Sequence, residues 1–222
     1  EAMIVFDDVF VPWERVFLCG EWKFSMLLAY TFATFHRFTA ISYKVPAVEV
    51  MAGIAAAMAE YNGLDKVGHV RDKLAEIAGY VETLRALANA SAKDPVMYGD
   101  IAVPNPLITN MAKLHFATQY HQMLAYVQDI TGGLIATGPS EDDLNSPQTG
   151  AFVRRYLGGR KGVAVEDRLK AINLVKELTA TDFAGYQAVL AIHAEGSIEA
   201  EKLAMVREHD SARCVALAKQ LA

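Results

Sequence analysis

Residues 22–61 read WKFSMLLAYTFATFHRFTAISYKVPAVEVMAGIAAAMAEY. The stretch is rich in alanine, leucine and methionine, and its apolar residues recur with a helical period. It ends at Asn62-Gly63, a pair typical of helix ends, and Pro46 within it removes one backbone hydrogen-bond donor. We therefore expect one long helix, kinked at Pro46, and a helical fold around it.

Four further long helices and a short one are expected downstream, because glycine, proline or asparagine marks almost every break in the helical pattern. They cover residues 64–92, 106–130, 147–157, 165–193 and 197–221. Asn105 and Pro106 form a typical helix start, as N-cap and first helical residue. Short connections make successive long helices antiparallel, so the sequence predicts an all-α fold, an up-and-down bundle with an extra terminal helix.

Residues 3–17 differ from the rest, because they read as a β-strand, MIVFDDVFVPWERVF. No second run of this kind follows, and a buried strand without a partner leaves its backbone groups unpaired. We expect residues 1–20 to be the last strand and linker of a preceding β-domain that is missing, and residues 21–222 to be a C-terminal helical bundle domain. The alternative is an extended arm lying on the helices.

Composition excludes several classes of function. The 222 residues carry a formal net charge of -5, so neither nucleic acid nor an anionic membrane surface is an expected partner. Charged residues interrupt the apolar stretch at 22–59, so no membrane span is expected. Cys19 and Cys214 lack any disulfide or zinc-ligand spacing, which favours the reducing cytoplasm and no metal site. The apolar stripes of the first and third long helices are wider than one core face needs, which indicates a further domain or subunit.

Several dispersed segments resemble one family of flavoproteins. Residues 6–12 (FDDVFVP), the bundle after them and residues 128–133 (QDITGG) are similar to the C-terminal part of acyl-CoA-dehydrogenase-like enzymes. Residues 17–22, 61–63, 69–74 and 132–134 narrow the resemblance to the branch with 4-hydroxybutyryl-CoA dehydratase (also a vinylacetyl-CoA isomerase) and the flavin-dependent 4-hydroxyphenylacetate 3-monooxygenases. The resemblance implies a tetramer, a dimer of dimers, in which FAD lies between domains and a neighbouring subunit supplies part of its site.

The same resemblance ranks two activities. The dehydratase holds an iron–sulfur cluster, and two of its ligands, a histidine and a cysteine seven residues apart, correspond here to His36 and Tyr43. A phenol oxygen is a hard ligand and a poor substitute for a thiolate, so the cluster is not expected. The leading hypothesis is a monooxygenase-like enzyme that uses reduced FAD, supplied by a flavin reductase, to hydroxylate a small aromatic substrate. The alternatives are a dehydratase or isomerase of an acyl-CoA substrate, and a non-catalytic oligomerisation domain.

Two groups of residues are the candidate site. His36, a base or flavin partner, and Arg37, a phosphate partner, interrupt an aromatic helix segment, although both could simply face solvent or a subunit contact. Paired glycines at a helix end let backbone approach a ligand, although they also simply terminate helices. The resemblance therefore implies a catalytic role for His36 and cofactor binding by the following residues: Arg37, Gln128, Asp129, Gly132 and Gly133.

Overall fold

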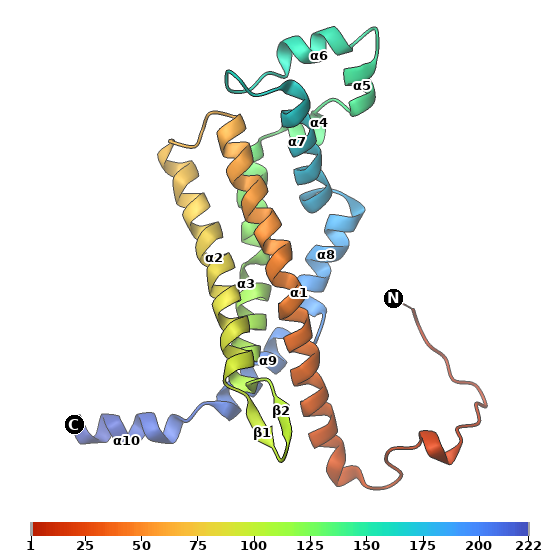
Figure 1. The fold of residues 1–222 in the computed structure, drawn as a ribbon. Helices are drawn as coiled ribbons and strands as arrows, with labels where there is room; N and C mark the ends of the chain where they lie inside the picture. Colours follow the sequence, from red (N-terminus) through yellow and green to blue (C-terminus); the bar gives the residue numbers. More distant parts are fainter. Residues whose placement is uncertain (1, 222) are drawn as a thin grey trace.

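The computed structural model describes residues 2–221 as an up-down-up-down bundle whose fourth position is filled by two shorter helices in succession (Figure 1). The helices of the bundle are α1 (Ser25–Tyr61), α2 (Gly68–Lys93), α3 (Pro106–Thr131), α7 (Val165–Thr179) and α8 (Asp182–His193). A short 3₁₀ turn, Trp22–Phe24, leads into α1, which continues through Pro46. Helices α1 and α3 begin and end close to the positions that the sequence predicts, and α2 begins four residues later than predicted.

The core lies along the axis of the bundle, where α1, α2, α3 and α7 meet. Its members are spaced at helical steps on one face of each helix, which is why amphipathic sequences assemble in this way. Representative members are Ile41, Val48, Ala55 and Met58 from α1, Ile77 and Leu84 from α2, Met123, Val127 and Ile130 from α3, and Ile172 and Val175 from α7. Burial of this apolar surface provides the main stabilisation of the domain.

Small elements close the two ends of the bundle. At one end, the antiparallel strands β1 (Val96–Tyr98) and β2 (Ile101–Val103) join α2 to α3, with Tyr98 opposite Ile101. Gly99 has φ +60, a conformation that a tight hairpin needs and that glycine adopts at little cost. At the other end lie α4 (Leu134–Thr137), α5 (Glu141–Asn145) and α6 (Gly150–Tyr156) (Figure 1). The hairpin stands where the sequence suggested only a loop, and α6 begins later than residue 147.

Two predicted long helices are each divided in the structure. The segment 165–193 breaks into α7 and α8 because the Thr181 hydroxyl accepts a hydrogen bond from the Ala184 N–H and caps a new helix. The segment 197–221 breaks into α9 (Ile198–Glu208) and α10 (Ser211–Leu221), with the Asp210 carboxylate accepting from the Arg213 N–H. Side-chain caps therefore outweigh the continuous apolar period at both places. Helix α9 packs on α3, whereas α10 points away from the bundle (Figure 1).

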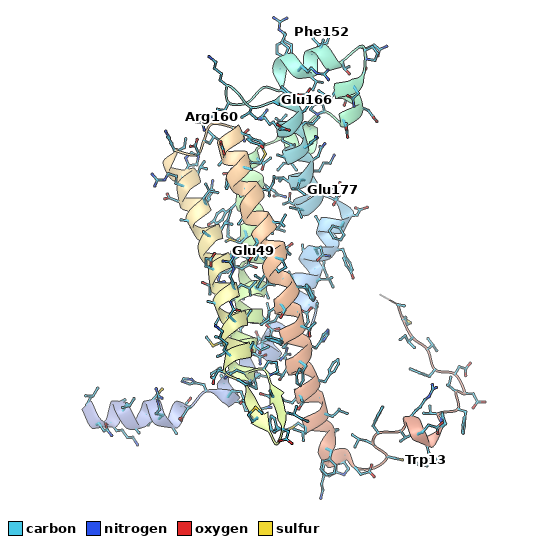
Figure 2. The ribbon with its side chains drawn as sticks, in the orientation of Figure 1. Trp13, Glu49, Phe152, Arg160, Glu166 and Glu177 are labelled. Carbon is cyan, nitrogen blue, oxygen red and sulfur yellow. The ribbon has the colours of Figure 1, made fainter. Side chains whose placement is uncertain are left out.

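The predicted N-terminal strand does not form within this chain. The described residues before α1 hold only 3₁₀ turns, Trp13–Arg15 and Trp22–Phe24, and Met3, Phe6 and Phe10 are exposed. The arm runs free of the bundle with side chains such as Trp13 pointing into open space (Figure 2), so it does not lie along the helices either. The physical reason is the one that the sequence indicates: a strand needs a neighbouring strand, and β1 and β2, the strands of the described residues, pair only with each other. That residues 1–20 belong to a preceding β-domain stays a prediction.

Helix α1 is more apolar than the sequence argument allowed. In the described part of the chain, Trp22–Tyr61 is one helix that passes the length and hydropathy test for a membrane span, so the argument from interrupting charges was wrong by this measure. The central helix of a bundle meets the same test, and here α1 packs against α2, α3 and α7. Arg37 and Lys44 are among its buried residues.

One side chain joins three helices at the α4–α6 end of the bundle. The Asn62 amide donates to the Ile130 carbonyl at 3.0 Å, and its Oδ1 accepts from Arg168 Nε and Nη2 at 3.1 and 2.8 Å. Arg168 in turn donates to the Leu157 carbonyl at 2.7 Å. Asn62 thus links the ends of α1 and α3 to α7 and to the loop before it.

We expect Asn62→Ala to lower the free energy of unfolding by about 2 kcal/mol, because it leaves the Arg168 guanidinium and a carbonyl without their partner. Denaturant titration followed by circular dichroism measures this loss. The exposed Asn145 in α5 provides the control, since Asn145→Ala removes the same group without these contacts. Equal effects of the two substitutions would contradict the linking role of Asn62.

Candidate functional site

Helix α1 presents an exposed aromatic face opposite its buried one. Phe32, Phe35, His36 and Tyr43 lie at helical steps on this face, and Phe32 and Tyr43 are 65% and 57% exposed. The His36 ring is tilted against the Phe32 ring, with 5.4 Å between centroids. His36 is therefore open to any group that covers this face.

Arg37 points the other way, into the bundle. Only 7% of it is exposed, its Nε donates to the Glu195 carbonyl at 2.8 Å, and its Nη1 donates to Asn110 Oδ1 at 2.7 Å. A Cβ on Gly196 would lie 2.5 Å from Arg37 Nη2, so glycine is needed where the guanidinium crosses the chain. Arg37 thus holds the turn between α8 and α9 from the buried side of α1, whereas the neighbouring His36 is exposed.

That turn places a carboxylate beside α1. Glu195 has φ +62, an uncommon conformation for a non-glycine residue, and its side chain is 3% exposed. Its Oε2 accepts from Lys44 Nζ at 2.6 Å, and its Oε1 accepts from the Tyr43 hydroxyl at 2.9 Å. Backbone strain of this kind persists only where surrounding contacts determine it, and it concentrates at functional sites.

Burial shifts the pKa values of Lys44 and Tyr43, the two residues whose side chains contact Glu195. Burial lowers the pKa of the Lys44 ammonium, although the contact with Glu195 opposes that effect. Burial, together with the hydrogen bond to Glu195, raises the pKa of Tyr43 to about 12. A buried carboxylate in contact with a lysine ammonium and a tyrosine hydroxyl is a combination found at general acid–base sites.

A cavity of about 320 Å³ adjoins the group. It is lined by residues of α1, α3, α7 and α8, and its polar lining residues are Tyr43, Lys44, Tyr120 and Gln187. Its apolar walls include Met51, Phe116 and Leu190. Apolar walls with a few polar groups are typical of sites for small organic molecules.

The second predicted group lies at the end of α3. Gln128 donates to the Thr179 carbonyl at 2.9 Å, and the exposed Asp129 pairs with Lys73 of α2. Gly132 has φ +86, and neither Gly132 nor Gly133 has an atom within 4 Å of the place where a Cβ would stand. The backbone here is open to a ligand, while Gln128 and Asp129 serve contacts inside the chain.

The structure does not bring the two predicted groups together. Asn62, at the end of α1, touches Ile130 near the end of α3, whereas His36 lies 26 residues earlier on the same continuous helix. At about 1.5 Å per residue, this corresponds to about 39 Å along the bundle. One chain therefore presents His36 and Gly132 at separate places.

Sequence reasoning missed the two residues at the centre of the buried group, Lys44 and Glu195. Each had a signal: Lys44 interrupts an apolar helix face, and Glu195 stands before Gly196 at a helix break. Neither signal indicates that the two side chains meet, because 151 positions separate them in the chain.

The fold defines a class of protein domain: the C-terminal helical domain of acyl-CoA-dehydrogenase-like enzymes. The sequence profile of the family described as "HpaB: 4-hydroxyphenylacetate 3-hydroxylase C terminal" matches residues 25–222. The chain belongs to this family.

Two curated relatives represent two activities. The 4-hydroxybutyryl-CoA dehydratase/vinylacetyl-CoA-Delta-isomerase of Clostridium aminobutyricum is 30% identical over 233 residues, which cover 100% of this chain and 47% of the relative. The oxygenase component of 4-hydroxyphenylacetate 3-monooxygenase of Thermus thermophilus is 32% identical over 192 residues, which cover 84% of this chain and 39% of the relative. The chain thus spans less than half the length of these relatives.

Two similar solved structures represent the same two activities. An oxygen-tolerant archaeal 4-hydroxybutyryl-CoA dehydratase from N. maritimus matches with a TM-score of 0.85 and 33% identity, covering 98% of this chain and 43% of that one. The oxygenase component HpaB, complexed with FAD and 4-hydroxyphenylacetate, matches with a TM-score of 0.87 and 26% identity, covering 97% and 46%. The predicted family and helical fold are confirmed.

We expect Lys44→Met and Glu195→Gln each to lower the free energy of unfolding by about 3 to 5 kcal/mol, because each removes the nearest opposite charge from a buried group. The double variant should lose less than the sum of the two, since neither charge then remains alone. Denaturant titration of the four proteins measures this coupling.

The exposed pair Lys202–Glu199, at 2.7 Å, is the matched control. Lys202→Met should leave the unfolding free energy unchanged within error, because solvent screens such pairs. Additive losses at Lys44 and Glu195 would contradict a buried, coupled pair.

Proposed function

We propose that this chain is the C-terminal domain of an FAD-dependent enzyme of the 4-hydroxyphenylacetate 3-monooxygenase type. Such an enzyme uses reduced FAD, supplied by a separate flavin reductase, to hydroxylate a small aromatic substrate. Membership of the family, with its FAD-bound structural neighbour, supports this proposal. The single structural observation that carries it is the exposed aromatic face of α1 with His36 at its centre, a surface suited to a flat aromatic cofactor.

The residues present fit FAD at two places. The open backbone of Gly132 and Gly133 accommodates the close approach of a nucleotide, because no Cβ stands in the way. The face of α1 offers aromatic rings and an imidazole to the flavin ring. Bound reduced FAD would supply the electrons for activating dioxygen.

The residues of this chain would act around the cofactor as follows. His36 is available as a base, or as a hydrogen-bond partner of the flavin, on the open face of α1. Glu195 holds a proton-accepting carboxylate beside the small cavity, and Tyr43 and Lys44 orient it. Arg37 has two of its donors committed inside the chain, so the geometry favours a role in holding the Glu195 turn over phosphate binding.

The distance between the two predicted groups favours an oligomer. Because His36 and Gly132 are separated by about 39 Å along one bundle, one flavin site would be built from His36 of one chain and the glycine pair of another. Exposed apolar residues on the arm, α1 and α10 offer the surface for such assembly. A homotetramer, a dimer of dimers in the cytoplasm, is part of this proposal.

A dehydratase or isomerase of an acyl-CoA substrate is the second candidate, and the buried Lys44–Glu195–Tyr43 group favours it. Such a reaction needs a positioned group to remove a proton from carbon, and Glu195 is suited to that task. Tyr43 weighs against the iron–sulfur cluster, because its hydroxyl is a hard oxygen and already donates to Glu195. A non-catalytic oligomerisation domain is the third candidate, and it would leave the buried Lys44–Glu195–Tyr43 group without an explanation.

The first test uses the full-length protein, purified without oxygen and reconstituted with FAD. We expect the absorption spectrum of bound flavin, no stoichiometric iron, and hydroxylation of 4-hydroxyphenylacetate when reduced FAD is supplied. Four irons per chain with a broad iron–sulfur band would overturn the monooxygenase reading in favour of the dehydratase. Absence of flavin binding would favour the third hypothesis, a non-catalytic oligomerisation domain.

The second test isolates the glycine pair. Gly133 has helical φ and ψ of -60° and -15°, with open space around its Cα, so Gly133→Ala should fold as well as the original protein. If FAD lies against this backbone, we expect its dissociation constant to rise about tenfold, which fluorescence titration of the full-length protein measures. Gly158→Ala, another glycine with open space, is the control. Equal affinities of both variants would argue against this part of the site.

A further inference from the structure

A second ion pair lies deeper in the bundle, behind the Lys44–Glu195 contact. Lys113 of α3 and Glu201 of α9 are both fully buried, and Lys113 Nζ lies 3.5 Å from Glu201 Oε1. Lys113 also donates to the Ala191 carbonyl at 3.2 Å. Among the described residues, neither carboxylate oxygen of Glu201 has a hydrogen-bond partner of normal geometry.

Such an arrangement is costly as a means of joining two helices. A buried carboxylate without hydrogen bonds loses its hydration and recovers only part of it from a cation at 3.5 Å. Two apolar residues of similar size would join α3 to α9 at least as well. The pair therefore calls for a reason other than stability.

The position of Lys113 beside Glu195 suggests what the Lys113–Glu201 pair is for. Lys113 Nζ lies 4.0 Å from Glu195 Oε2, the oxygen that already accepts from Lys44 at 2.6 Å. Cations from α1 and α3 thus converge on one carboxylate oxygen, which leaves Oε1 directed at the Tyr43 hydroxyl.

The charged and titratable groups around this point come from α1, α3, α9 and the α8–α9 turn. They are Arg37, Tyr43 and Lys44 from α1, Lys113 from α3, Glu195 from the α8–α9 turn and Glu201 from α9. Three cations face two carboxylates, so loss of the Glu201 charge would leave a buried excess of two positive charges. Glu201 is therefore the counter-charge that faces Lys113 on the side away from Glu195 and Lys44.

We propose that Lys113 and Glu201 are positioning residues for the Glu195 group: Lys113 holds the Oε2 side of the carboxylate from α3, and Glu201 balances the charge of Lys113. The pair touches neither the cavity nor the exposed face of α1, so it acts through Glu195 and Lys44. This role rests on the proposed function, in which Glu195 is the proton-accepting group.

The test measures the pKa of Lys44 in the full-length protein. Trace acetylation with acetic anhydride across a pH series, quantified on the Lys44 peptide by mass spectrometry, gives the midpoint, because only the neutral amine reacts. Glu201→Gln removes a negative charge that favours the Lys44 ammonium, so the midpoint should fall. Lys113→Met removes a positive charge that disfavours it, so the midpoint should rise. Each shift is expected to be on the order of one pH unit.

Opposite directions of shift distinguish charge from packing, since loss of packing alone has no reason to produce opposite signs. Glu199→Gln, an exposed change on the same helix, is the control and should leave the midpoint in place. Lys113→Arg keeps the positive charge and should retain most of the original value. If Lys113→Met fails to fold, the shift of the Lys44 midpoint in Glu201→Gln alone tests the proposal.

An unchanged midpoint in Glu201→Gln, or shifts of the same sign in both variants, would overturn the proposal. The measurement needs neither FAD nor turnover. Failure of the proposed function would therefore appear in the flavin and iron assays, whereas failure of this inference would appear in the Lys44 midpoint.

Discussion

The contact between Lys44 and Glu195 is the constraint on which the site depends. It joins the middle of α1 to the turn between α8 and α9, and the two side chains are almost completely buried. A buried charge is tolerated only with a partner, so this contact determines where the turn lies on α1. The left-handed backbone of Glu195, the glycine at position 196 and the guanidinium of Arg37 all follow from holding that carboxylate in place.

Helix α1 serves two environments at once. One face packs into the bundle with Ile41, Val48 and Met58, and the opposite face presents Phe32, His36 and Tyr43 to the outside. A helix that is apolar on both faces is unfavourable in water unless something covers the second face. The exposed face of α1 is therefore the surface on which the proposed assembly with other copies would form.

The helices were predictable where local signals agreed with the tertiary packing. Asn105 and Pro106 begin α3 as expected, and Asn62-Gly63 ends α1, because caps and terminators act over only a few residues. The divisions at Thr181 and Asp210 were missed, since apolar spacing continues across both and only the hydroxyl and carboxylate caps reveal the break. The hairpin at Val96–Val103 was read as a loop because its strands have three residues each.

By itself, the sequence determined the helical class, the family and the identity of the groups that line α1, since these depend on residue type and spacing along one element. His36 and Tyr43 share a face because seven residues make two helical turns. Only the tertiary structure decided that Arg37 turns inward, that Glu195 meets Lys44 across 151 positions, and that His36 and Gly132 stand at separate places of the bundle. The physical reason is that such meetings depend on the packing of distant helices, whose energies are sums over many contacts that no local stretch of sequence contains.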